Sequence, residues 1–217
     1  MIETRLYSEQ KLDWPESGQH ILAHYDSNSI VVYQAYRPSI ASFAVANQKF
    51  GGDFSYSRMS WIKPNFLWMM YRSGWAEKEG QERILAISIK RSFFDEILEM
   101  AVPSSFAPDA YESMDAWKAA VSQSDVRLQW DPDHDPDGKA VSRRAIQLGL
   151  RGNMLKRYGG LEVLAIEDIT SFVTAQRANQ TNRNDSFVTP VERAYTPASQ
   201  AAAKNAGIEL LMTKSIT

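Results

Sequence analysis

The sequence predicts an α+β fold, with helices packed against a mixed or antiparallel sheet. Runs of β-branched and aromatic residues alternate with helical patterns, but without the regular spacing of a parallel doubly wound sheet. The 217 residues suit one domain, and a chain of this length buries enough surface to fold without disulfide or metal support. We expect residues 1–195 to form that single domain and residues 196–217 to form a polar C-terminal tail.

The first strand is predicted at 30–36, where the run IVVYQAY is rich in β-branched and aromatic residues. A helix should follow over 39–50, because Pro38 or Ser39 suits its first turn and Gly51–Gly52 follows its end. The residues of this helix are mostly small, so we expect it to pack closely on a sheet.

The segment 54–75 is dense in aromatic residues. Pro64 suits the start of a helix and Gly74 suits its end. Three tryptophans recur at a spacing of seven: Trp61, Trp68 and Trp75. We expect these indoles to be mainly core, packed against the 39–50 helix and the sheet. A base-stacking platform is the functional alternative.

The same signals place the remaining elements. Strands are predicted at 83–91, 126–130, 143–150 and 161–166, and helices at 93–100, 113–121, 153–158 and 167–177. From Gln176 the composition shifts to Asn, Thr, Gln, Ala and Ser, which favours an extended tail with a last short helix or strand at 208–212.

Charge is unevenly distributed along a chain whose net charge is −2. Residues 27–75 hold five basic side chains and one acid, and residues 139–157 hold six basic side chains and no acid. Residues 77–118, which lie between these two basic segments, carry nine acids and five bases. This pattern predicts a local positive pocket, with solvated faces as the plain alternative.

Several classes of protein are excluded by what the sequence lacks. Without cysteine there is no disulfide, zinc ribbon, iron–sulfur ligation or thiol catalysis. There is no Walker loop, G-x-G-x-x-G, G-x-S-x-G or H-E-x-x-H motif. The charged start MIETRLYSEQ does not resemble a signal peptide and no run is long enough to span a membrane, so we expect a cytoplasmic protein.

The predicted strand 143–151 (RRAIQLGLR) offers a candidate ligand face. Alternation places Ile146, Leu148 and Leu150 on a core side that also carries Arg144. The opposite side carries Arg143, Gln147 and Arg151, separated by Ala145 and Gly149. Small residues let a ligand approach the backbone and guanidinium groups suit phosphate, so we expect ligand binding there; a solvated outer face is the alternative.

The loop QWDPDHDPDG precedes this strand. Its D-x-D-x-D-G spacing imitates a calcium loop, but Pro136 interrupts it and Arg144 replaces the closing glutamate, so we expect no metal. His134 lies between Asp133 and Asp135, whose charges should raise its pKa. It is a candidate general acid or simply a solvated loop residue.

Other polar residues offer weaker signals. His20 and His24 are four apart and would share a helical face, yet no carboxylate ligand follows at a known spacing. Arg37 ends the 30–36 strand just before a helix, a common place for an anion-binding side chain. Arg58 precedes the tryptophans and Arg72 lies on the helix with Trp68, so both are candidates to converge with the Arg-rich strand.

The segments YQAYRPSIA, RMSWIKPNFLWMMYRSGW, QWDPDH, RRAIQLGLRG and PVERAY resemble the sequence blocks of family 4291 in the domain-of-unknown-function series. The resemblance covers about 33–195. No established reaction accompanies this family, so it implies no catalytic residue. It implies that the Arg-rich strand, the tryptophans and PVERAY belong to one domain.

The order of elements is also similar to that of ADP-ribosyltransferases, which bind NAD with residues on a split sheet. The similarity rests on a strand ending in an aromatic–Arg pair, a small-residue helix and an aromatic block. It implies NAD as a candidate cofactor. No clear late E-x-E motif is present, and Gln147, Glu162 and Glu167 are poor substitutes for its glutamate.

We therefore expect an Arg-lined cleft that binds a phosphate-bearing small molecule, with a nucleotide as the leading choice. If the protein is an enzyme, the expected reaction is group transfer on that nucleotide. Arg37, Arg143 and Arg151 would hold the anion, while Gln147 would orient the ligand and His134 would donate a proton. The alternative is a non-catalytic module that binds RNA or single-stranded nucleic acid.

Overall fold

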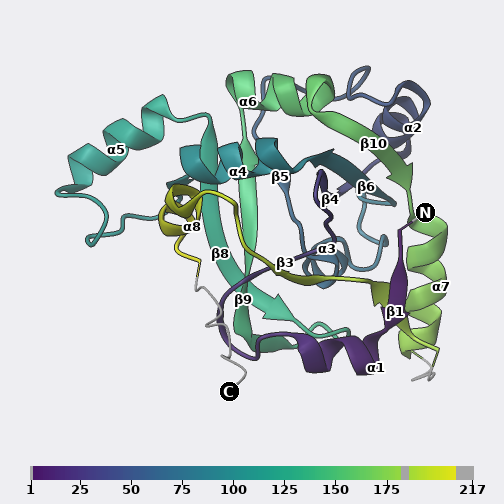
Figure 1. The fold of residues 1–217 in the computed structure, drawn as a ribbon. Coiled ribbons are helices and arrows are strands. Elements are labelled where there is room, and N and C mark those ends of the chain that lie inside the picture. Colours follow the sequence, from purple (N-terminus) through teal and green to yellow (C-terminus); the bar gives the residue numbers. More distant parts are fainter. Residues whose placement is uncertain (1, 182–185, 209–217) are drawn as a thin grey trace.

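The computed structural model describes residues 2–181 and 186–208, which fold around two sheets (Figure 1). The first sheet is antiparallel, in the order β10–β6–β4: β4 Ser29–Tyr36, β6 Arg83–Lys90 and β10 Val163–Asp168. The second is mixed, in the order β2–β9–β8–β7, with β5 also paired to β9: β2 Gly18–Gln19, β5 Ser60–Ile62, β7 Val102–Pro103, β8 Val126–His134 and β9 Ala140–Leu150. The predicted α+β class is confirmed.

The two sheets meet where β4 passes the end of β5. The backbone N–H of Tyr33 donates to the carbonyl oxygen of Lys63 at 2.7 Å. Two short antiparallel pairs complete the strands: β1 Thr4–Leu6 with β11 Val188–Pro190, and β3 Ile21–Ala23 with β12 Arg193–Tyr195. The PVERAY segment is therefore built into the fold, as the family resemblance implied.

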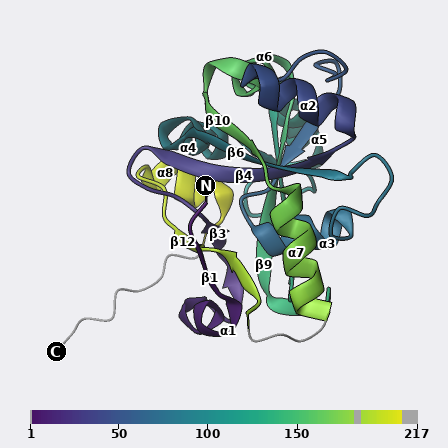
Figure 2. The same ribbon diagram turned by 90° about the vertical axis from the view of Figure 1, so that its right-hand side faces the viewer.

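Eight α-helices lie in the described part of the chain: α1 Tyr7–Gln10, α2 Pro38–Asn47, α3 Phe66–Ser73, α4 Arg91–Met100, α5 Met114–Gln123, α6 Gly152–Lys156, α7 Thr170–Thr181 and α8 Gln200–Ala206. Short 3₁₀ and π-helical turns extend α1 and α6. Figure 2 shows α2 and α6 above the β4–β6 sheet and α3 and α7 below it. None of the described helices has the length and apolar character needed to cross a membrane.

The β4–β6 sheet is apolar on both faces because it separates two cores. Ile30 and Val32 of β4 pack into one cluster, which includes residues of α2, α4 and β9. Val31 and Tyr33 pack into a second cluster with residues of α3 and α7. Alternation along a strand sends neighbours to opposite sides. This explains why the run IVVY is apolar throughout rather than at every second position.

The helix predicted from Pro64 and Gly74 is α3, and its ends follow known capping chemistry. The side chain of Asn65 accepts a hydrogen bond from the backbone N–H of Trp68 at 2.6 Å, satisfying one of the free amides of the first turn. Gly74 has a φ of 58°, the left-handed conformation that glycine adopts at low cost after a helix. The cap and the glycine together limit α3 to two turns.

Strand β8 is longer than the predicted 126–130, because it continues through Pro132 to His134. Proline is tolerated there for two reasons. The pairing of β8 with β9 shifts in register between Pro132 and His134, and on the other edge of β8 the described partner β7 pairs only with Arg127 and Leu128. The long β8–β9 hairpin that results forms one wall of the molecule.

The segment 196–208 contains α8, which packs on the core. Ala202, Ala203 and Ala206 are buried. Asn205 donates hydrogen bonds to the carbonyl oxygens of Leu98, Glu99 and Ala101 at the end of α4. The element predicted at 208–212 lies, beyond its first residue, outside the described residues.

Candidate functional site

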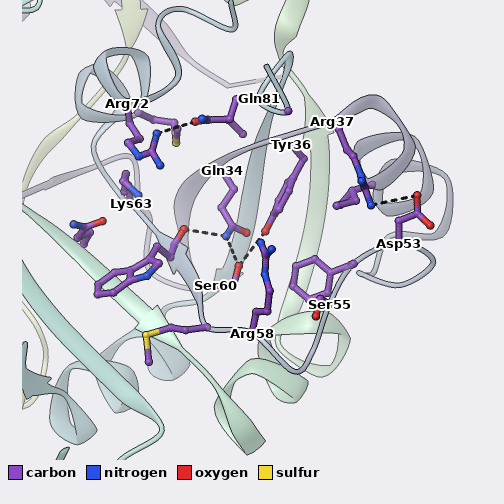
Figure 3. A pocket seen from close by; sticks show the side chains of 18 of the residues that line it. Gln34, Tyr36, Arg37, Asp53, Ser55, Arg58, Ser60, Lys63, Arg72 and Gln81 are labelled. Atoms are coloured by element: carbon purple, nitrogen blue, oxygen red, sulfur yellow. Dashed lines mark hydrogen bonds and ion pairs between the residues drawn. The ribbon is translucent and has the colours of Figure 1, made fainter. Parts of the chain in front are cut away.

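A cleft of about 870 Å³ opens where the two sheets meet (Figure 3). It is bordered by the end of β4, the segment 53–61, the second half of α3 and the middle of the β8–β9 hairpin. The polar side chains that line it are Gln34, Tyr36, Arg37, Asp53, Ser55, Arg58, Ser60, Lys63, Arg72, Gln81, Gln129 and Gln147. Its volume lies in the range of pockets that hold small molecules.

A hydrogen-bonded network fixes the wall between β4 and β5. The amide nitrogen of Gln34 donates to Ser60 Oγ at 2.9 Å and to the carbonyl oxygen of Trp61 at 3.0 Å. Its amide oxygen accepts from the hydroxyl of Tyr158 at 2.7 Å, and the Tyr36 hydroxyl lies 3.1 Å from Ser60 Oγ. Burial raises the pKa of Tyr36 above its usual range, so the phenol stays neutral.

Four cationic side chains line the cleft: Arg37, Arg58, Lys63 and Arg72. Asp53 is the only acid among its described lining residues, and it lies 3.6 Å from the Arg37 guanidinium across an exposed ion pair. Arg72 donates to the amide oxygen of Gln81 at 3.3 Å. Because positive charges outnumber negative ones, the cleft favours an anionic ligand.

Lys63 differs from the three arginines because it is buried, with only 4% of its surface exposed. Burial, and secondly the neighbouring Arg72, lower the pKa of its ammonium group to about 8. Its nitrogen lies 6.0 Å from the centre of the Trp68 ring. Sequence reasoning overlooked this residue, since a single lysine between Ile62 and Pro64 gives no distinctive motif.

Gln147 lines the cleft from β9, on the face predicted for it. Its amide nitrogen donates to one carboxylate oxygen of Asp131 at 2.7 Å, and Gln129 of β8 donates to the other at 2.8 Å. Asp131 thus fixes both amide groups at the wall of the cleft. Gln147 joins Arg37, Arg58 and Arg72 there, so the structure brings these four predicted residues together.

The structure does not bring Arg143 into the cleft. Its guanidinium forms a buried ion pair with Asp133 at 2.6 Å and donates to the carbonyl oxygen of Pro15 at 2.5 Å. It also lies over the Trp14 ring, 5.3 Å from its centre. All of these contacts are internal, which suits a residue that supports the hairpin.

Arg151 also lies apart from the cleft lining. It donates to the carbonyl oxygens of Val121 and Ser122 in the last turn of α5, and to that of Ser124. These carbonyls have no partner within the helix, so Arg151 caps its C-terminal end. The expected convergence of Arg143, Gln147 and Arg151 in one site is therefore not found.

The small residues of β9 have a different reason from the predicted one. Trp61 of β5 pairs with Gly149, and a Cβ at this glycine would lie 2.6 Å from Met59 Sδ and 3.1 Å from the Trp61 ring. The glycine gives room to protein side chains rather than to a ligand. Ile146, Leu148 and Leu150 are buried as expected.

His134 is buried outside the cleft lining, in a stack of rings. Its ring centre is 3.5 Å from that of Tyr71 and 5.4 Å from that of Trp68, with both ring planes within 10° of parallel. Burial lowers the pKa of His134 and outweighs the opposite effect of Asp133 and Asp135. The sequence-based expectation that those carboxylates would raise this pKa is corrected.

The histidine pair is not a shared helical face, because His20 and His24 flank strand β3. His24 Nδ1 lies 2.8 Å from the carbonyl oxygen of Val191. Within the residues that the structure describes, no group of three or more His, Asp or Glu side chains is arranged to hold a metal ion.

The three tryptophans occupy three environments. Trp68 is buried with 7% exposed, as expected, and Trp61 is half-buried at the cleft. Trp75 is half-buried and its ring contacts Phe66 of α3 and Phe187. The expectation that they pack against the 39–50 helix is corrected: Trp68 and Trp75 lie at α3, on the opposite side of the β4–β6 sheet from α2.

Residues 20–195 match the family described as a domain of unknown function (DUF4291). The chain belongs to this family. The matched segment contains the β10–β6–β4 sheet, the second sheet apart from β2, and every residue that lines the cleft. No curated protein matches the chain. Membership in DUF4291 therefore confirms the sequence resemblance, and the geometry of the cleft is the guide to its chemistry.

Proposed function

We propose that the cleft binds a phosphate-bearing small molecule, with a nucleotide such as NAD as the first candidate. The observation that carries this proposal is the gathering of Arg37, Arg58, Lys63 and Arg72 around a cleft with one acidic lining residue. Guanidinium groups form charge-assisted and often bidentate hydrogen bonds with phosphate oxygens. Arg58 and Arg72 are exposed toward solvent, so a ligand reaches them without displacing core residues.

The remaining polar groups suit the uncharged parts of such a ligand. Gln147 and Gln129 present amides held by Asp131. The Ser60 hydroxyl is held by Gln34, and the Tyr36 hydroxyl is held by Ser60. Amides and hydroxyls hydrogen-bond to ribose and base edges. Held in place before binding, they lose little conformational freedom when the ligand arrives.

The proposed reaction, if the site is catalytic, is group transfer on the bound nucleotide. Gln147 keeps the orienting role assigned from the sequence.

The buried or half-buried indoles support a small-molecule cleft over a surface for RNA or single-stranded nucleic acid, which requires exposed rings for stacking.

A screen of nucleotides, NAD and sugar phosphates by thermal shift, followed by calorimetric titration of the best hit, tests this proposal. Arg58→Ala and Arg72→Ala should each weaken binding about tenfold or more, since a charge-assisted hydrogen bond contributes about 1.5–3 kcal/mol. Binding should also weaken as salt concentration rises.

Arg5→Ala is the matched control. Arg5 is exposed and pairs with Glu9 and Asp13, away from the cleft lining. It should leave the dissociation constant unchanged. Equal affinities for wild type, Arg58→Ala and Arg72→Ala would reject the cleft as the binding site, and the absence of any hit would reject the proposed ligand class.

A further inference from the structure

The cleft contains a buried primary amine whose position is fixed by the backbone. Lys63 directly follows β5, its carbonyl oxygen accepts from Tyr33 N, and the next residues, Pro64 and Asn65, lead into α3. Its side chain lines the cleft (Figure 3). Lysines are rarely buried without an anionic partner, because an isolated ammonium loses its hydration. Within the described residues, Lys63 Nζ has neither an ion pair nor a hydrogen bond.

The groups around Lys63 favour its neutral form. Burial is the main cause, Arg72 adds repulsion, and Asp131 opposes both to a smaller degree. With a pKa of about 8 in place of the usual 10.5, the neutral fraction at pH 7 is roughly two orders of magnitude larger than that of an exposed lysine. The neutral amine has the lone pair that a nucleophile needs, and burial beside another cation is a known means of activating lysine toward carbonyl compounds.

We propose that Lys63 forms an imine with the open-chain aldehyde of a sugar phosphate held in this cleft. The inference rests on the proposed function, because Arg58 and Arg72 supply the phosphate contacts that bring the aldehyde to the amine. It goes further by naming the reacting atom and the class of ligand.

The reaction conserves atoms and charge without an added oxidant or reductant. The Nζ lone pair attacks the carbonyl carbon, the C=O π bond breaks, and the oxygen takes up a proton. The resulting carbinolamine loses that oxygen as water, while the remaining N–H proton stays on a protonated imine or passes to solvent. Amine and aldehyde thus give imine and one water.

Two sources share this chemistry. One is a free sugar phosphate, and the other is a nucleotide whose terminal ribose has a free anomeric carbon. Both contain a phosphate next to a masked aldehyde, and a cleft of about 870 Å³ has room for either.

Reductive trapping on the full-length protein tests the proposal. The protein is incubated at pH 7 with ribose 5-phosphate, ADP-ribose or ribose in the presence of cyanoborohydride, and modified lysines are located by peptide mass spectrometry. We expect Lys63 to be labelled at least tenfold faster than exposed lysines such as Lys49, and at least tenfold faster by a phosphorylated compound than by ribose. Labelling by only one of the two phosphorylated compounds identifies the source.

Two variants sharpen the result. Lys63→Arg keeps the positive charge but cannot form an imine, so the cleft adduct should disappear while slow labelling elsewhere is unchanged. Lys49→Arg is the control and should leave labelling of Lys63 intact. If Lys63→Arg fails to fold, the map of adducts in the wild-type protein still decides the question.

Labelling of Lys63 no faster than that of Lys49, or equally fast with ribose, would overturn the inference. Calorimetry then separates the two proposals. Phosphate-bearing ligands that bind through Arg58 and Arg72 without an adduct at Lys63 would eliminate the imine alone. Failure of all such ligands to bind would eliminate the proposed function as well.

Discussion

At the scale of single residues, Glu192 is a buried ionisable group whose surroundings disfavour its charged form. The carboxylate of Glu192 accepts the backbone N–H of Phe66 at 2.7 Å and the Asn65 amide at 3.4 Å, at the start of α3. Burial nevertheless raises its pKa well above the usual range, and Asp133 adds to the effect. Glu192 is therefore a group for which the folded state retains a proton more strongly than the unfolded state.

Replacing Glu192 by glutamine should reveal this effect as pH dependence. A carboxyl whose folded pKa is raised stabilises the native state fully below its unfolded pKa and progressively less as pH rises toward the folded value. Glutamine keeps a carbonyl acceptor for Phe66 N–H and does not titrate. The free energy of unfolding of Glu192→Gln should therefore increase relative to that of wild type as pH rises from about 4.5 to 7, by up to about 1.4 kcal/mol for each pH unit.

Urea unfolding at several pH values measures this difference. Glu192→Ala is the informative comparison, because it leaves the Phe66 N–H and the Asn65 amide without their acceptor and should destabilise at every pH by about 1–3 kcal/mol. A pH-independent difference between Glu192→Gln and wild type would show that the carboxyl is not perturbed.

At the scale of elements, the cleft depends on how closely β5 lies against β9. Ser60, Trp61 and Ile62 pair with Leu150, Gly149 and Leu148, and Lys63 follows directly. Strand β5 is short, so its position is set by this pairing and by the bridge from Lys63 to Tyr33 in β4. A shift of β5 would move Ser60 and Lys63 together.

Gly149→Val tests this dependence. The added side chain would press on Met59 and the Trp61 ring, and overpacking of this kind costs about 1–3 kcal/mol. Since the strain falls on β5, the dissociation constant of the cleft ligand should rise along with the loss of stability.

Gly160→Ala is the control, because a Cβ there would make only ordinary contact, 3.6 Å from Lys49 Cβ. Unfolding free energy and ligand affinity are both measured. Unchanged affinity in a destabilised Gly149→Val protein would show that the β5–β9 contact supports the fold without shaping the cleft.

At the scale of the whole molecule, local signals in the sequence predicted the elements better than their assembly. Strand and helix positions followed from β-branched runs, prolines and glycines, and the buried side of β9 followed from alternation. Arg37, Arg58, Arg72 and Gln147, which line the cleft, were each candidates from the sequence, although the expected convergence was with Arg143 and Arg151.

The errors arose where long-range pairing determines the environment. Arg143 and Gln147 share a strand face. Arg143, however, contacts Asp133 and Pro15, whereas Gln147 lines the cleft. The small size of Gly149 reflects β5, which is 87 or more residues earlier in the chain. Lys63 became notable only through its burial, which a sequence pattern does not report.

Helix α8, the last helix in the described part of the chain, links separate parts of the molecule. Asn205 of α8 donates to three carbonyl oxygens at the end of α4, between 2.8 and 3.1 Å, and Trp130 of β8 donates to the carbonyl oxygen of Ala206 at 2.9 Å. Helix α8 thus joins α4 to the hairpin.

Asn205→Ala removes the donors for the carbonyls at the end of α4 and should lower the free energy of unfolding by about 1–3 kcal/mol. Lys204→Ala, on the exposed side of α8, should change it by no more than about 0.5 kcal/mol. Because these contacts lie outside the cleft lining, neither variant should alter ligand affinity; equal stability of the two variants would show that α8 is not held by its polar contacts with α4.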